Sequence, residues 1–288
     1  MTLISALLGI AADRLLTHLH EYRRYNNFLR YVDWMRAHFR GAAWDHFGGL
    51  LVVLLPVWLL VGGVQLWTHD WLFGLLGLLY YIAVFVYCLG PRDLSVDVDT
   101  WCEVSESSDS VLRQRAAGRL LRGEPAPENS AEGAQRLSRA VLVEAGDRLF
   151  AVLFWFVLLG PLGAVAYRSA AVLYFQRSEQ GAFGDSIAWL YAVLLWPPAR
   201  LTALGFALTG HFDSALEGWR QAHRDQPRGA AGSERVLMQT GGGALALDDQ
   251  TFEDITAPVV RAAMRLVWRT LTLWLVVLSL LVLAGWAG

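Results

Sequence analysis

The stretch LLWPPARLTALGF, residues 194–206, decides the fold, because it lies in an apolar run and yet contains Pro197, Pro198 and Arg200. Proline removes a backbone donor from a helix, and a charge is costly in hydrocarbon. As a helix, residues 187–196 would reach only about 15 Å, half of a bilayer core. Since proline suits the first turn of a new helix, the pattern predicts a broken transmembrane helix at residues 196–200.

Such a break would place free N–H groups and the positive end of a helix dipole beside Arg200 within the membrane. This combination predicts a site for an anionic small molecule or a lipid phosphate. The alternative is a kinked span in which Arg200 extends its long side chain to the cytoplasmic surface.

The composition of the chain is that of a membrane protein. Of its 288 residues, 55% are hydrophobic and 17% are charged, whereas about 25% are charged in soluble domains. The net charge of −2 disfavours a nucleic-acid partner. The sequence contains no lysine, which excludes a Schiff-base or P-loop lysine, and Cys88 and Cys102 lack the spacing of a zinc site or a disulfide framework.

The alternation of apolar and polar segments predicts an all-α, polytopic membrane helical bundle with cytoplasmic helical segments. The predicted regions are a short apolar helix and an amphipathic basic helix in 1–48, a transmembrane hairpin in 49–90, a cytoplasmic segment of two helical arms around a loop in 91–148, transmembrane helices in 149–210, a second cytoplasmic segment in 211–265 and a last transmembrane helix in 266–288. Arginines gather in the long polar segments, which the positive-inside rule places in the cytoplasm. Five spans satisfy this arrangement, or six if residues 2–16 also cross.

Residues 18–48 form a basic, aromatic segment in which Phe28, Val32 and Met35 recur at helical spacing and several arginines face away. The pattern predicts an amphipathic helix. Its arginine-bearing face suits the headgroups of an anionic leaflet, which makes membrane lipid an expected partner. The alternative is a helix packed on the cytoplasmic part of the protein itself.

Three further charges are candidates for a functional site. Arg168 ends the apolar run GPLGAVAYR, residues 160–168, in which Gly160 and Pro161 permit a kink; the alternative is an arginine at the outer membrane interface. Glu144 and Asp147 are three residues apart on a predicted helix and share a face. Such a pair is able to ligate a cation or to pair with an arginine.

These residues carry a family resemblance. The segments PARLTAL at 198–204, GPLGAVAYR at 160–168 and FW at 154–155 resemble, at matching spacing, the cobalamin-biosynthesis membrane proteins of the CobD/CbiB superfamily. Within it, the start MTLISALLGIAADRLL and the segment LTGHFDSALEGW at 208–219 look like the AmpE family. That resemblance implies a multi-pass protein of the bacterial inner membrane, the partner of AmpD in β-lactamase induction.

The cobalamin branch is similar to an ATP-dependent, magnesium-requiring amide synthase, whose chemistry needs carboxylates for the metal. By the resemblance, Asp147 falls on the acidic motif of that branch, but Val143 replaces a usual Glu and Arg168 a usual Lys. The paired aspartates expected before PARL are Tyr191 and Ala192. The loss of these groups implies a retained pocket without the synthase reaction.

The leading interpretation is an inner-membrane regulatory or sensory protein of cell-wall stress and β-lactamase induction. It would bind an anionic or phosphorylated ligand through Arg200, Arg168, Tyr167 and Asp13, and a protein partner in cell-wall recycling is expected. The sequence identifies no definite cofactor, and Mg²⁺ is the candidate that Glu144 and Asp147 would suit. The alternatives are a Mg²⁺- and ATP-dependent amide synthase that uses Asp13, Glu144 and Asp147 as ligands, and a transporter for a cell-wall fragment.

Overall fold

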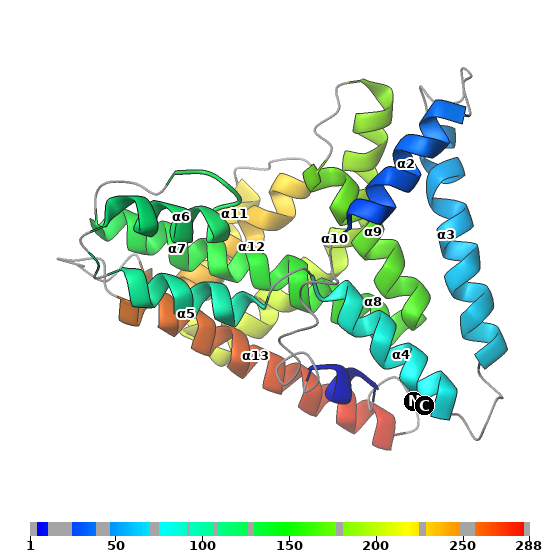
Figure 1. Cartoon of the computed structure of the whole chain (residues 1–288). Coiled ribbons are helices and arrows are strands. Elements are labelled where there is room, and N and C mark those ends of the chain that lie inside the picture. Colours follow the sequence, from blue (N-terminus) through cyan, green and yellow to red (C-terminus); the bar gives the residue numbers. More distant parts are fainter. Residues whose placement is uncertain are drawn as a thin grey trace. The chain divides into compact units, whose positions relative to one another are not determined.

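All regular secondary structure that the computed structural model describes is helical, so the predicted all-α class is confirmed (Figure 1). The structure describes residues 5–10, 25–38, 47–68, 75–90, 93–105, 107, 109–125, 130–176, 181–224, 229–247 and 257–284. Asp13, a predicted ligand-binding residue, lies outside the described residues. Of the predicted short apolar helix, residues 5–10 are described and are helical.

The chain divides into two compact units. The first unit comprises Met1–Pro91 and Ala151–Leu195, together with Gly288, and the second unit comprises Arg92–Phe150 and Trp196–Ala287. The two units are described separately below.

Three helices in the described part of the chain are long and apolar enough to span a membrane: α3 (Phe47–Thr68), α10 (Ala182–Thr209) and α13 (Ala257–Leu283). They overlap the hairpin predicted in 49–90, the transmembrane helices predicted in 149–210 and the last transmembrane helix predicted in 266–288, respectively. Their outer faces are rich in exposed apolar side chains, such as Leu59 and Leu280. The second helix of the hairpin predicted in 49–90 is α4 (Leu75–Cys88). It has 14 residues, about 21 Å, and is shorter than a hydrocarbon core.

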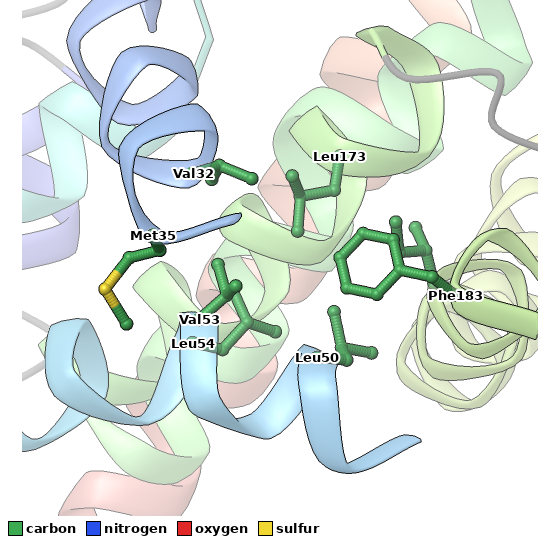
Figure 2. Close-up of a cluster of buried hydrophobic side chains, with 8 residues drawn as sticks. Val32, Met35, Leu50, Val53, Leu54, Leu173 and Phe183 are labelled. Carbon is green, nitrogen blue, oxygen red and sulfur yellow. The ribbon is translucent and has the colours of Figure 1, made fainter. Parts of the chain in front are cut away.

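The core of the first unit joins α2 (Asn26–His38), α3, α9 (Pro161–Gln176) and the first turns of α10 (Figure 2). Its buried members are Val32, Met35, Leu50, Val53, Leu54, Leu173, Phe183 and Ile187. The apolar face predicted within residues 18–48 therefore packs against other helices of the chain. Lipid contact by its opposite, polar face stays a prediction.

The second unit begins with α5 (Leu94–Val104), α6 (Ser110–Leu120) and α7 (Ser130–Ala145), which lie side by side (Figure 1). Of the two predicted helical arms, the first is divided into two helices, α5 and α6, and α7 follows the loop. Asp109 starts α6 by accepting hydrogen bonds from the N–H groups of Val111 and Leu112, at 2.9 and 3.2 Å, which is the usual role of aspartate at a helix start. Beyond α7 the chain continues through a π-helical turn, η4 (Gly146–Phe150).

The predicted polar segment 211–265 contains α11 (Phe212–Arg224), α12 (Ala230–Ala244) and the first residues of α13. α11 and α12 pack backbone to backbone: a Cβ atom at Gly218 would lie 2.3 Å from the carbonyl oxygen of Gln239. The N–H of His211 donates to the carbonyl of Ala244 at 2.9 Å and fixes the start of α11 to the end of α12. α13 packs along α5 and α7.

Candidate functional site

The two prolines of the predicted break lie inside a continuous helix, because α10 runs from Ala182 to Thr209 through Pro197 and Pro198. The prediction of a broken helix at residues 196–200 was therefore wrong. Pro198 deprives the carbonyl of Leu194 of its helical donor, and the indole Nε1 of Trp155 donates to that carbonyl instead, at 2.8 Å. A neighbouring donor of this kind allows a membrane helix to contain proline. Because α10 does not restart at Pro198, it offers no N-terminus of its own beside Arg200, and the dipole argument based on a broken α10 does not hold.

The interruption occurs instead at Gly160, where the sequence indicates a kink. Its φ of +66° is left-handed and ends α8 (Ala151–Leu159), and Pro161 is the first residue of α9. The side chain of Gln65 on α3 bridges the break: its Nε2 donates to the carbonyl of Leu159 at 3.3 Å, and its Oε1 accepts from the N–H of Leu162 at 3.1 Å. The first part of the transmembrane region predicted in 149–210 thus consists of two helices, α8 and α9. The N–H of Leu162 at the start of α9 already has a protein acceptor.

Arg200 lies on the α10 portion of the second unit and is half-buried. Its guanidinium carbon is 4.2 Å from the centre of the Trp196 ring, a cation–π geometry. Its Nη1 lies 3.2 Å from the carbonyl oxygen of Trp196 and 3.4 Å from the hydroxyl of Ser233 on α12. The recorded partners of Arg200 among the described residues are thus a ring, a carbonyl and a hydroxyl, all of them neutral.

Arg168 lies in the first unit and is only 8% exposed, on α9. Its Nε donates to the hydroxyl of Tyr25 at 3.0 Å, and that hydroxyl donates to the carbonyl of Tyr87 at 2.9 Å. The neighbouring Tyr167 is fully buried, with its ring 6.2 Å from that of Tyr191. Arg168 is therefore integrated into a buried polar network rather than exposed at the surface of the chain.

Glu144 and Asp147 lie together in the second unit, buried to 3% and 4% exposure. Arg122 forms ion pairs with both, with Nε to Glu144 and with Nη2 3.7 Å from Asp147. Its Nη1 pairs at 3.0 Å with Glu234 on α12. Arg148 also pairs with Glu144 and reaches Asp97 on α5 at 3.2 Å. We call these six residues the charged cluster: Asp97, Arg122, Glu144, Asp147, Arg148 and Glu234.

The charged cluster holds four carboxylates against two guanidinium groups. Burial raises the pKa of Glu234, and the positive charge of Arg122 opposes that rise. Across the described ranges, no three His, Cys, Asp or Glu side chains are grouped to hold a metal ion. Guanidinium groups lie where a cation between Glu144 and Asp147 would sit. This arrangement favours the ion-paired alternative for these two residues, and their role as magnesium ligands stays an untested prediction.

The sequence gives no indication of Arg122, Asp97 and Glu234, because each is distant in sequence from the residues with which it pairs. The only local signal was the four-residue spacing of Glu144 and Arg148, which suits a pair on one helix face. The unusual backbone of Arg122, with a φ of +53°, is a feature of the folded turn that sequence composition does not reveal.

Together these features define an all-helical membrane protein with buried charges held in ion pairs and hydrogen bonds. The family described as regulatory signalling modulator protein AmpE matches residues 1–287. The chain therefore belongs to the AmpE family, and it is a membrane protein of a regulatory signalling type.

The relatives include members of both branches that the sequence resembles. The chain is 29% identical to the cobalamin biosynthesis protein CobD of Stutzerimonas stutzeri (strain A1501), over 98% of each chain. It is 30% identical to CobD of Chromobacterium violaceum over 60% of this chain, which spans 56% of that protein. It is 26% identical to Protein AmpE of Shigella flexneri, over 76% of this chain and 78% of that protein. No solved structure matches the chain.

Proposed function

We propose that this chain is a multi-pass inner-membrane sensor that acts in β-lactamase induction and cell-wall stress and binds a phosphate-bearing ligand at Arg200. The proposal of a phosphate-bearing ligand rests on the environment of the Arg200 guanidinium. Among the described residues its partners are the ring and carbonyl of Trp196 and the hydroxyl of Ser233, all of them neutral, and Trp196 is 55% exposed. A phosphate, with several strong acceptors, suits such an arginine.

Binding at Arg200 has a direct route to the charged cluster. Arg200 contacts Ser233, and the next residue of α12 is Glu234, which pairs with Arg122. A ligand that draws Arg200 away from Ser233 would remove a contact between α10 and α12. A shift of α12 would then move Glu234 and so change its ion pair with Arg122 and the contacts of the helices that this arginine joins. Differential contacts of this kind are what couples a ligand to a conformational change.

The test compares Arg200→Ala with Arg200→Lys, and uses Arg119→Ala, an exposed arginine on α6, as the control. Inducible β-lactamase activity is measured after exposure of cells to a β-lactam, with membrane expression checked for each variant. We expect Arg200→Ala to abolish induction, Arg200→Lys to retain part of it and the control to be unchanged. Normal induction by Arg200→Ala would refute the site.

Two sources of phosphate are separated with purified protein. One arm adds inorganic phosphate to the protein in detergent, and the other compares nanodiscs of phosphatidylglycerol with nanodiscs of phosphatidylcholine. An Arg200-dependent rise in melting temperature in the first arm indicates a soluble ligand. A rise only in phosphatidylglycerol indicates a lipid headgroup.

A second candidate function, a synthase of the cobalamin-biosynthesis type, is favoured by the alignment with CobD of Stutzerimonas stutzeri over 98% of both chains. The ion pairs of Glu144 and Asp147 with Arg122 speak against it, because they occupy the carboxylates that a metal would need. Magnesium-dependent ATP turnover in the presence of a corrinoid carboxylate and an amino-alcohol phosphate would establish this activity. Absence of turnover would exclude these substrates.

A further inference from the structure

Helix α11 carries an apolar stripe on the side adjacent to its contact with α12. The stripe consists of Phe212, Leu216, Trp219 and His223, which follow one another at intervals of four, three and four residues and so lie along one side of the helix. Phe212 is 49% exposed and Trp219 is partly exposed. The imidazole of His223 is exposed and stacks on the indole of Trp219 with 5.5 Å between the ring centres.

The stripe is distinct from the face that α11 uses inside the protein. That inner face consists of Ala215, Gly218 and Ala222, which are buried, and the close approach of Gly218 to α12 leaves no room there for larger groups. A third side is polar and exposed, with Glu217 and Gln221. The helix therefore has an inner side, a partly exposed aromatic side and a polar side, which is the pattern of a helix lying in a membrane interface.

The position of α11 relative to a membrane span supports this reading. α10 has 28 residues, which corresponds to about 42 Å and matches the thickness of a bilayer with its headgroup layers. Leu204 and Leu208 keep its outer surface apolar up to its last turn, with 48% and 59% exposure. Only two residues separate Thr209 from Phe212, so α11 begins in the headgroup layer in which the span ends.

We propose that α11 lies in the headgroup layer of a phospholipid bilayer, where its stripe contacts the upper acyl chains and its arginines contact phosphates. Arg220 is exposed next to the stripe, and Arg224 is exposed and lies 4.0 Å from Glu217. Tryptophan and arginine together suit this layer, since one end of each side chain is apolar and the other is polar. Continuity with the exposed leucines of α10 favours lipid over a protein partner.

The experiment places a diazirine-bearing amino acid at single positions of the full chain reconstituted in vesicles of phosphatidylethanolamine and phosphatidylglycerol. The test position is Phe212. The control positions are Leu208, on the outer face of the α10 span, and Gln221, on the polar side of α11. After illumination, lipid and protein adducts are identified by mass spectrometry, and circular dichroism verifies that each variant retains its helix content.

We expect lipid adducts at positions 208 and 212 and no lipid adducts at position 221. Adducts of position 212 with a second copy of the chain or with another protein would overturn the proposal. So would equal lipid labelling at 212 and 221, or lipid labelling at 208 alone. The result is independent of the ligand proposed for Arg200, because induction is not measured.

Discussion

The charged cluster predicts that Arg122 is required for the stability of the second unit. Its guanidinium joins the turn after α6 to Glu144 at the end of α7, to Asp147 in η4 and to Glu234 on α12. Removing one partner of a buried pair costs about 3–5 kcal/mol, because the other charge stays buried without compensation. Since the side chain of Arg122 is 30% exposed, we expect Arg122→Ala to lose about 3 kcal/mol, the low end of that range.

A second substitution at the same position separates charge from backbone conformation. Arg122 adopts a φ of +53°, a left-handed conformation that costs most residues about 1–2 kcal/mol and glycine little. Arg122→Gly removes the same ion pairs but relieves that conformation, so it should be more stable than Arg122→Ala by about 1 kcal/mol. The ion pairs explain why an arginine occupies a position that glycine would occupy more easily.

The assay is thermal unfolding of the purified protein in detergent, followed by circular dichroism at a fixed heating rate. A loss of about 3 kcal/mol corresponds to a fall of roughly 6–12 °C in melting temperature for a domain of this size. In an Arg122→Ala background, Glu234→Gln should recover part of the loss, because it removes a carboxylate that has lost its partner. The reasoning is refuted if Arg122→Ala has the same melting temperature as the parent, or if Arg122→Gly is less stable than Arg122→Ala.

The carboxylate of Glu234 determines whether the stability rises or falls with pH. The folded pKa of Glu234 is raised above its ordinary value of 4.5, so the folded state holds this proton more tightly than the unfolded state. The resulting stabilisation is complete below pH 4.5 and is lost as the pH rises through the folded pKa. The melting temperature of Glu234→Gln should therefore gain on that of the parent as the pH rises above 4.5 and through the folded pKa. A constant difference across this range would contradict the assignment.

Two predictions concern the helix packing of the first unit. Trp155→Phe should lower stability by about 1–3 kcal/mol, because the carbonyl of Leu194 loses its donor. Adding Pro198→Ala should restore the stability, since alanine at position 198 supplies an N–H to that carbonyl. If the second substitution does not rescue the first, this account of the prolines is refuted. Gly163→Ala should cost about 3 kcal/mol of stability, because its Cβ would lie 2.2 Å from the carbonyl oxygen of Trp155. The control Gly62→Ala, whose Cβ would lie 3.6 Å from its nearest neighbour, should melt at or above the temperature of the parent. Equal effects of the two substitutions would show that close approach is not the reason for glycine at position 163.

The sequence was sufficient for features that depend on local spacing. The apolar spans, the face of α2 that buries Val32 and Met35, and the proximity of Glu144 to Asp147 all follow from helical periodicity. The alternative that these two carboxylates pair with an arginine is confirmed, but only the fold identifies Arg122, because a turn 22 residues earlier in the chain brings it there. Local periodicity carries no information about such distant pairs.

The same limit explains why the break was assigned to the wrong prolines. A helix ends where its backbone donors are lost and no substitute is supplied, and the identity of a substitute depends on neighbouring helices. At Pro198 the substitute is Trp155, 43 positions earlier in the sequence, so α10 continues. At Gly160 the left-handed φ turns the chain away from the helix axis, and no side-chain donor is able to reverse that. A glycine directly before a proline is therefore a stronger signal for a helix break in this chain than two consecutive prolines, because it changes the direction of the backbone as well as its hydrogen bonding.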